Sequence, residues 1–177
     1  MTVSGCIALL YDIFKIMTKL HGGEVAVLLH NIRSTHNVGS IFRTADALGV
    51  YKIYLSGYTP TPVDKFSRAR KDVAKVALGA EKNIVWEYVK NPETIIKKLK
   101  KEKYQVVALE QSKKSIDYKK VKIARPVLFI VGNEVVGIEP KILSLADVVA
   151  EIQMKGNKES LNVSVAFGVA VFRILGI

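Results

Sequence analysis

A chain of 177 residues is long enough for one domain with a buried core, and a second domain is not expected. Its 49% hydrophobic and 24% charged residues exclude a largely disordered protein, and no apolar run is long enough for a membrane-spanning helix. The net charge of +11 favours a polyanionic partner, with nucleic acid the first expectation and an anionic membrane surface the alternative.

The N-terminal segment of residues 1–23 is predicted to be an extension, of unknown role, to a single domain that spans residues 1–177. Within it, Ile7–Leu20 has the apolar spacing of a helix. Met1–Phe14 has no basic region and no small-residue cleavage site, so a secretory leader is not expected. The expected location is therefore the cytoplasm, and the one cysteine, Cys6, which cannot form an internal disulfide, agrees with a reducing compartment.

The strands are predicted from short apolar runs rich in β-branched residues, which alternate with helical patterns. This alternation is typical of βαβ units, and nearly continuous apolar strands indicate a sheet covered on both faces. We therefore expect an α/β fold with a parallel sheet. Its predicted strands are Glu24–His30, Tyr51–Gly57, Ile84–Trp86, Gln105–Glu110, Pro126–Gly132 and Val148–Met154.

The predicted helices are Asn37–Gly49, Ser67–Leu78, Asn91–Lys103 and Ser160–Leu175, each with apolar residues at helical spacing. Asn91 is expected to cap the third helix, with Pro92 in its first turn. The last helix is apolar on nearly every side, which predicts that it lies in the core or covers a second subunit. The lysines of the third helix are expected to be solvated: Lys97, Lys98, Lys100, Lys101 and Lys103.

The first of three polar segments follows the first strand, from His30 to Asp46. Ligands bind at the carboxyl ends of the strands in parallel sheets. Asn31, Asn37 and Arg43 concentrate hydrogen-bond donors suited to phosphate and ribose oxygens. Spacing alone equally allows Asn37 to cap the helix and Arg43 to pair with Asp46 one turn on.

The second polar segment interrupts a buried strand at Gly132, which would let a ligand approach the backbone closely. Glu134 could then hydrogen-bond a substrate, or hold the first segment by pairing with Arg33 or Arg43. Alternatively, Glu134 lies in the first turn of a new helix, near its positive end.

The third polar segment runs from Ile152 to Ala166 and enters the last helix. Ser160 is predicted to cap that helix. Asn162 lies in a very apolar helix start and would be costly to bury unless its amide has partners. A ligand or a facing subunit could supply them.

Together these segments resemble the motifs of the SpoU/TrmH methyltransferases of the SPOUT superfamily. The matching motifs are Asn-Ile-Arg with Asn-x-Gly-x-x-x-Arg-Thr (31–44), Gly-Asn-Glu (132–134) and Ser-Leu-Asn-Val-Ser (160–164). The resemblance covers Glu24 to the C-terminus, and Ala77–Lys82 is similar to the tRNA-modifying branch. It implies a Rossmann-like parallel sheet with a C-terminal deep trefoil knot, and a homodimer paired through the helices that follow the knot.

The activity implied by the resemblance is transfer of a methyl group from S-adenosylmethionine to a ribose 2′-hydroxyl of tRNA or rRNA. Arg43 would be the catalytic residue. Because a guanidinium is protonated at ordinary pH, Arg43 could act as a base only in strongly perturbing surroundings, and orienting the phosphate and hydroxyl is the milder alternative. Asn31, Glu134, Ser160 and Asn162 would shape the site, and the cofactor would be held, mostly by main-chain groups, at Leu109, Gly132, Ile152, Met154, Ser160 and Leu161.

Two residues depart from the family pattern. Gln153 stands where the family usually has proline, and Val135 where a glycine is common, so the local loop shapes stay open. A non-catalytic RNA-binding protein of the same fold, or methylation of a base instead of a ribose, are the alternative functions. No metal site is expected, since His30 and His36 have no third ligand at a recognised spacing.

A basic surface beside the first motif is predicted to bind RNA, with Tyr58 and Phe66 as stacking partners for bases. A solvated helix face is the alternative. The predicted RNA-binding residues are Arg33, Lys65, Arg68, Arg70, Lys71 and Lys75.

Overall fold

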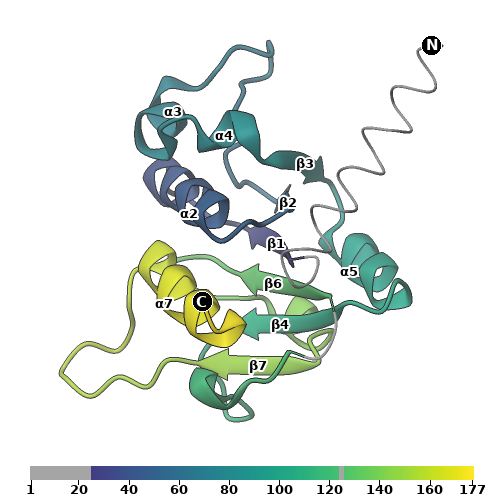
Figure 1. Ribbon diagram of the computed structural model, residues 1–177, viewed down its shortest axis with the longest axis vertical. Helices are drawn as coiled ribbons and strands as arrows, with labels where there is room; N and C mark the ends of the chain where they lie inside the picture. The colour runs from purple at the N-terminus through teal and green to yellow at the C-terminus, as the bar shows by residue number, and fades with distance from the viewer. Residues whose placement is uncertain (1–24, 124–125) are drawn as a thin grey trace.

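The computed structural model describes residues 25–123 and 126–177, so the predicted helix Ile7–Leu20 lies outside the described residues. A seven-stranded sheet forms the centre, with every pairing parallel and the order β3-β2-β1-β6-β4-β7-β5 (Figure 1). The predicted α/β class and parallel sheet are confirmed. The strands are β1 (Val25–His30), β2 (Lys52–Ser56), β3 (Val85–Val89), β4 (Gln105–Leu109), β5 (Ile116–Asp117), β6 (Val127–Val131) and β7 (Val148–Glu151).

Helices cover both faces of the sheet, as the apolar strands predict. On one face α2 packs against α3, α4 and α7, and α7 also contacts η1. On the other face α5 and α6 cover the sheet. Their bounds are α2 (Thr35–Ala47), α3 (Lys71–Ala77), α4 (Ala80–Asn83), α5 (Pro92–Lys101), η1 (Tyr118–Lys120), α6 (Pro140–Leu143) and α7 (Val163–Leu175). In the described part of the chain, none of these helices is long and apolar enough to cross a membrane.

Alternate residues of the central strands belong to two different hydrophobic cores, one on each face of the sheet. Val27 and Leu29 of β1 belong to the core beneath α2 and α7, whereas Ala26 and Leu28 belong to the core beneath α5. This division follows from the two-residue period of a strand. Every residue of β1 and β6 is buried, which is why both strands are apolar almost throughout.

The strand order reverses between β1 and β6, and this position creates the site. From β1 the chain continues outward to β2 and then β3, while β6, β4 and β7 lie on the other side of β1. Such a reversal leaves a crevice at the carboxyl ends of the strands, where ligands bind. Because Leu29 of β1 is in register with Val131 of β6, the polar segments that follow these two strands lie next to each other.

Two helices begin at residues other than those predicted. Ser34 caps α2, its Oγ accepting the Asn37 N–H at 3.3 Å, so Asn37 lies inside the helix instead of capping it. Asn162 caps α7, its Oδ1 accepting the Ser164 N–H at 2.9 Å, so the predicted start and cap at Ser160 are wrong.

The predicted helix Ser67–Leu78 is also shorter, and α3 starts only at Lys71. Ser67 has a left-handed backbone, with φ of 60°, which a helix cannot include. Asp64 stabilises the resulting turn, because its Oδ1 accepts the N–H groups of Phe66 and Arg68. By contrast, Asn91 caps α5 and Pro92 lies in its first turn, as predicted.

Candidate functional site

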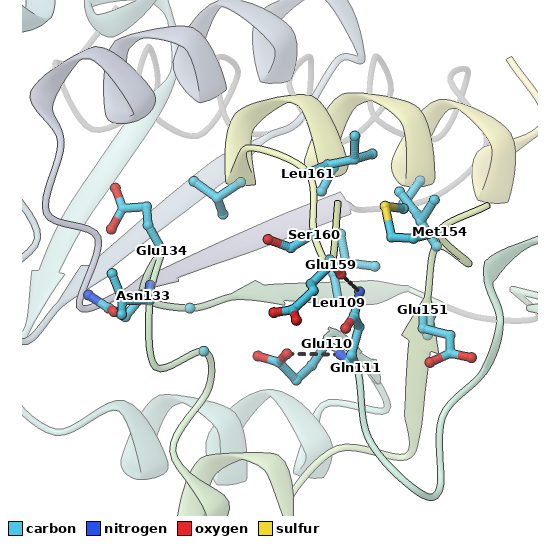
Figure 2. A pocket seen from close by; sticks show the side chains of 18 residues that line it. Leu109, Glu110, Gln111, Asn133, Glu134, Glu151, Met154, Glu159, Ser160 and Leu161 are labelled. Carbon is cyan, nitrogen blue, oxygen red and sulfur yellow. Dashed lines mark hydrogen bonds between the residues drawn. The ribbon is translucent and has the colours of Figure 1, made fainter. Parts of the chain in front are cut away.

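A pocket of about 310 Å³ opens at the carboxyl ends of β4, β6 and β7, beside the start of α7 (Figure 2). Its walls come from the loops that follow these three strands. Leu161 and Met154 offer apolar side chains on the side next to α7, and Glu110, Gln111 and Glu134 lie around the rest. The pocket includes every residue that the resemblance assigns to the cofactor: Leu109, Gly132, Ile152, Met154, Ser160 and Leu161.

Gly132 is required by a tight turn of the protein itself. A Cβ at this position would lie 2.7 Å from the Gly137 carbonyl oxygen and 2.6 Å from the Ile138 side chain. The chain folds back there because Asn133 and Gly137 exchange backbone hydrogen bonds of 3.1 and 3.0 Å. The Asn133 Oδ1 also accepts the N–H of Val135 at 2.8 Å, so the turn forms with valine where the family commonly has glycine.

Glu134 holds the loop that follows β1. Its carboxylate accepts the N–H groups of Arg33 and Ser34 at 2.9 and 3.1 Å and the Asn37 Nδ2 at 2.8 Å. The sequence allowed Glu134 to hold this loop through an arginine side chain, whereas the contacts use backbone amides and an asparagine. Burial alone would raise the pKa of Glu134, but the accepted hydrogen bonds outweigh it and lower the pKa below its ordinary value, which favours the ionised form.

Asn37 connects this carboxylate to the third motif. The Asn162 Nδ2 donates to the Asn37 Oδ1 at 3.0 Å, while the Asn162 Oδ1 accepts from Ser164. The polar partners that Asn162 needs therefore come from the same chain. A continuous hydrogen-bond chain, Glu134–Asn37–Asn162, joins all three motifs. The sequence predicted Asn37 as a donor to a ligand or as a helix cap, and not as the link between the other two motifs.

Arg43 lies on α2, six positions after Asn37, and its side chain is exposed. Within residues 25–123 and 126–177, no hydrogen bond or ion pair engages its guanidinium, so the alternative pairing with Asp46 is not formed. An arginine in this condition is free to bind a phosphate or another oxygen-rich group.

Asn31 lies outside the Glu134 chain. Its amide is engaged at both ends, with Nδ2 donating to Glu139 at 2.8 Å and Oδ1 accepting the Tyr58 N–H at 3.3 Å. Its backbone is left-handed, with φ of 59°. Asn31 therefore shapes the loop itself.

The predicted RNA-binding residues form two groups. Arg68 and Arg70 are paired with Asp64 and Asp72, at 2.7 and 3.5 Å. The other four are exposed, and their charged side-chain groups have no hydrogen-bond or ion-pair partner among the described residues: Arg33, Lys65, Lys71 and Lys75.

Both predicted stacking residues are exposed. The Phe66 ring lies 5.0 Å from the Lys65 Nζ and 4.9 Å from the Arg68 guanidinium carbon, while the Tyr58 hydroxyl accepts from Asn133. In the lysine cluster, Lys100 is paired with Asp147 at 2.7 Å and Lys97 with Glu93 at 3.6 Å, so the prediction that these two lysines are only solvated is wrong. No group of three or more metal-ligating side chains occurs in the described ranges.

The parallel sheet, the pocket at its carboxyl edge and the three joined motifs define a class of α/β protein built around a ligand site at a reversal of strand order. The SpoU rRNA Methylase family model matches residues 24–172. The chain belongs to this family, and the resemblance found in its motifs is confirmed.

Two curated relatives and one solved structure illustrate the similarity. The tRNA (guanosine(18)-2′-O)-methyltransferase of Aquifex aeolicus is 33% identical over 84% of this chain and 67% of its own length. The 23S rRNA (guanosine-2′-O-)-methyltransferase RlmB of Pseudomonas aeruginosa is 30% identical over 91% of this chain, which spans 62% of that protein. The AdoMet-bound rRNA methyltransferase of Sinorhizobium meliloti is 32% identical, with a TM-score of 0.77 over 86% of this chain and 56% of that one.

Proposed function

We propose that this chain is an S-adenosylmethionine-dependent RNA methyltransferase that modifies a ribose 2′-hydroxyl of tRNA or rRNA. The observation that carries the proposal is the chain Glu134–Asn37–Asn162, which joins the three family motifs beside the pocket and includes a residue of α2, the helix that also carries Arg43. The names of the relatives support the same activity, since they methylate guanosine riboses in tRNA and 23S rRNA.

The pocket is suited to S-adenosylmethionine, which supplies an electrophilic methyl group when bound. Leu109, Met154 and Leu161 offer apolar contacts, and Gly132 and Ile152 offer backbone groups. Glu110 stabilises the walls by accepting the N–H of Ile138 at 2.7 Å. The related Sinorhizobium protein binds AdoMet, which supports S-adenosylmethionine as the cofactor.

The proposed role of Arg43 is to orient the RNA. A guanidinium keeps its proton at ordinary pH, so we assign to Arg43 the binding of a phosphate and the alignment of the hydroxyl, instead of removal of a proton. Correct alignment alone supplies a large share of the acceleration in a transfer between two bound groups. Glu134, Ser160 and Asn162 would shape the site around the reacting atoms, and Asn31 would keep the loop after β1 in place.

The RNA would be held by the exposed cations beside the first motif, Arg33, Lys65, Lys71 and Lys75, with Phe66 offering a stacking face. Arg68 and Arg70 can join them only by exchanging their acidic partners for phosphates. A cytoplasmic location is proposed because tRNA and rRNA are available there.

The proposed subunit arrangement is a homodimer. One face of α7 is buried on the core, yet Val165 and Val169, one turn apart, are 49% and 43% exposed. Leu161, before the helix, adds to this apolar surface. A second copy of the chain, packed through α7, would remove these side chains from water.

The deep trefoil knot is also part of the proposal. Its support is that the segment after β7 lies against the loops after β4 and β6, since all three line the pocket and the Gln111 Nε2 donates to the Glu159 carbonyl at 2.8 Å. A knotted path would hold these loops together without further contacts. An experimental map that traces residues 109–162 tests it, and an unthreaded path would contradict it.

The activity is tested by transfer of a tritiated methyl group from S-adenosylmethionine to unmodified tRNA and, separately, to unmodified rRNA. We expect incorporation into one of the two RNA classes. RNA binding without any incorporation, by protein that binds the cofactor in a calorimetric titration, would instead favour the non-catalytic RNA-binding alternative.

A further inference from the structure

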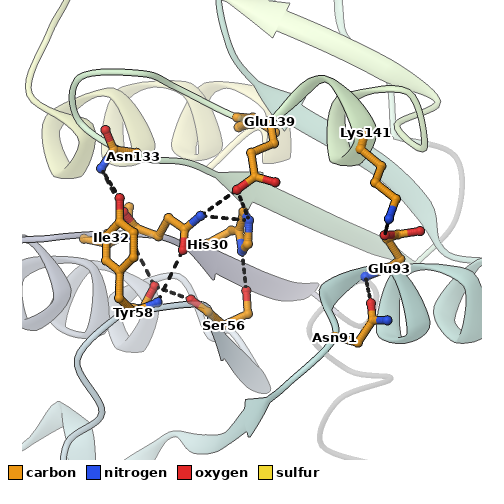
Figure 3. Close-up of polar contacts among 12 residues, drawn as sticks. His30, Ile32, Ser56, Tyr58, Asn91, Glu93, Asn133, Glu139 and Lys141 are labelled. Carbon is orange, nitrogen blue, oxygen red and sulfur yellow. Dashed lines mark hydrogen bonds and ion pairs between the residues drawn. The ribbon is translucent and has the colours of Figure 1, made fainter.

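A buried histidine lies at the end of β1, outside the residues used so far. His30 is 5% exposed, and its Nδ1 lies 2.8 Å from the Ser56 Oγ (Figure 3). Its Nε2 lies 3.3 Å from the Glu139 Oε1. The Asn31 Nδ2 lies 3.2 Å from the same Nε2, so this ring nitrogen either donates to the Glu139 carboxylate or accepts from the Asn31 amide, according to the tautomer.

A serine, a histidine and an acid in a row invite comparison with a hydrolase triad, but Ser56 cannot act as a nucleophile. The residue has no exposed surface, so no substrate carbonyl can reach its oxygen. The series Ser56–His30–Glu139 must therefore have a function other than nucleophilic catalysis. The second hydrogen-bond partner of Glu139, its exposed end, indicates what that function is.

The same Glu139 oxygen accepts the Asn31 Nδ2 at 2.8 Å. Asn31 is further fixed by its own N–H, which donates to the Ser56 carbonyl at 3.2 Å, and by its carbonyl, which accepts the Asn133 Nδ2 at 3.0 Å. Asparagine adopts a left-handed backbone more readily than most other residues, and these contacts hold Asn31 in that conformation. Glu139 thus fixes the turn by which the chain leaves β1.

The loop that this turn starts is the one that binds Glu134. The N–H groups of Arg33 and Ser34 both donate to the Glu134 carboxylate. Two acids of one short segment, Glu134 and Glu139, therefore hold residues 31–34 from their two ends. If the Glu139 contact were lost, the donors for Glu134 would be less well placed.

We propose that Glu139 is a positioning residue for methyl transfer, which acts by holding His30 and Asn31 so that the loop of residues 31–34 stays in place for Glu134. The inference rests on the proposed function, because its kinetic consequence is a slower transfer step. Glu139 itself touches neither the proposed cofactor pocket nor the reacting atoms.

The test compares Glu139→Ala and Glu139→Gln with Glu93→Ala as the matched control. Glu93 of α5 is ion-paired with Lys141 and Lys97 and, among the described residues, forms no hydrogen bond or ion pair with the loop of residues 31–34 (Figure 3). For each variant, kcat and KM are measured for both substrates. Hydrogen–deuterium exchange of residues 31–34 is measured in parallel.

For Glu139→Ala we expect kcat to fall about 10- to 100-fold, since misplacement by about 1 Å has effects of that size. The KM for S-adenosylmethionine should change less than about two-fold, because the proposed cofactor residues lie on other loops. Amide exchange of Arg33 and Ser34 should accelerate. Glu139→Gln should recover most of the rate, since its amide oxygen can still accept from Asn31, and Glu93→Ala should behave as wild type.

An unchanged kcat in Glu139→Ala would overturn the inference, as would a loss of rate shared by Glu93→Ala. Wild-type protein that methylates no RNA would contradict the proposed function instead. In that event the exchange measurement still decides whether Glu139 holds the loop, and unaltered exchange in Glu139→Ala would overturn the positioning role.

Discussion

Arg43 contributes little to stability, since its exposed guanidinium has no partner in the described part of the chain. We expect Arg43→Ala to slow methyl transfer about 10²- to 10³-fold, the effect of removing one preorganised donor. The free energy of unfolding should change by less than about 0.5 kcal/mol. Single-turnover transfer and urea denaturation measure the two quantities. Asp46→Ala, an exposed substitution on the same helix, should alter neither, and a normal rate in Arg43→Ala would refute the catalytic assignment.

Glu134 links stability to pH. Burial opposes ionisation, but the hydrogen bonds from Arg33, Asn37 and Ser34 lower the pKa of its carboxyl in the folded state. A depressed pKa contributes stability that is complete above the unfolded-state pKa and is lost as pH falls through the folded-state pKa.

Glu134→Gln should therefore be less stable at pH 7 by about 1 kcal/mol, which is below the range of about 1.5–3 kcal/mol for hydrogen bonds to a charged group because the side chain is partly exposed. The difference from wild type should shrink as pH falls below the ordinary glutamate range. Urea denaturation at a series of pH values measures it. Glu102→Gln changes an exposed acid and serves as control. A difference that does not vary with pH would contradict the assignment.

The individual site residues were partly predictable from the sequence. The motif positions of Glu134 and Asn162 were sufficient to select them, and both belong to the hydrogen-bond chain. Asn37 was considered only as a donor or a cap, because an asparagine near a helix start fits both. In the structure Ser34, three residues earlier, caps the helix. Asn37 is therefore buried inside the helix, where its side chain contacts the other two motifs.

Close packing between α2 and α3 depends on Gly39. A Cβ there would lie 2.7 Å from the Val73 carbonyl oxygen and 2.9 Å from the Val76 Cβ. The backbone of α3 cannot move away as easily as a flexible side chain could. We expect Gly39→Ala to lower the free energy of unfolding by about 1–3 kcal/mol, as overpacking does. Thermal and urea denaturation would measure it.

Gly168 of α7 provides the matched control. A Cβ added at Gly168 would lie 3.6 Å from the Thr44 methyl group, its nearest neighbour, and this is an ordinary van der Waals distance. Alanine has the higher helix propensity, so Gly168→Ala should be neutral or stabilising by up to about 1 kcal/mol. If both substitutions destabilised the protein equally, the close packing of α2 against α3 could not be the cause of the effect of Gly39→Ala.

At the level of elements, periodicity predicted the long segments and missed the short ones. The central strands were found to within about two residues because burial on both faces makes them continuously apolar. Strand β5, with two residues, and helix α6, with four, cover only about one period of their own patterns, so the apolar spacing does not repeat and cannot reveal them. Their positions depend on tertiary contacts with β7 and the second core.

The whole molecule carries an apolar surface on α7 that predicts its subunit state. We expect the wild type to be a dimer and Val165→Glu to shift it to a monomer, because a charge would be buried without a partner at the interface. Light scattering after size-exclusion chromatography measures the mass. Val85→Glu alters an equally exposed valine on the edge strand β3 and should remain dimeric. A monomeric wild type would contradict the proposed homodimer.

Charge over the whole molecule predicts how RNA binding responds to salt. Each phosphate contact contributes about −0.7 to −0.9 to the slope of log affinity against log salt concentration. Four free cations beside the first motif should therefore give a slope of about −3 to −4 per subunit. Lys71→Ala with Lys75→Ala should reduce the slope by about 1.5. The pair Lys98→Ala with Lys101→Ala on α5 is the control and should leave it unchanged. A flat salt response would contradict the RNA surface.

The central claim, methylation of a ribose, is tested most directly by alkaline hydrolysis of RNA that the protein has labelled with a tritiated methyl group. A 2′-O-methyl group blocks the hydroxyl that attacks the phosphate, so we predict that label appears in alkali-resistant dinucleotides, and that Arg43→Ala produces almost none. Label found only in alkali-released mononucleotides would contradict the account, because it would place the methyl group on a base.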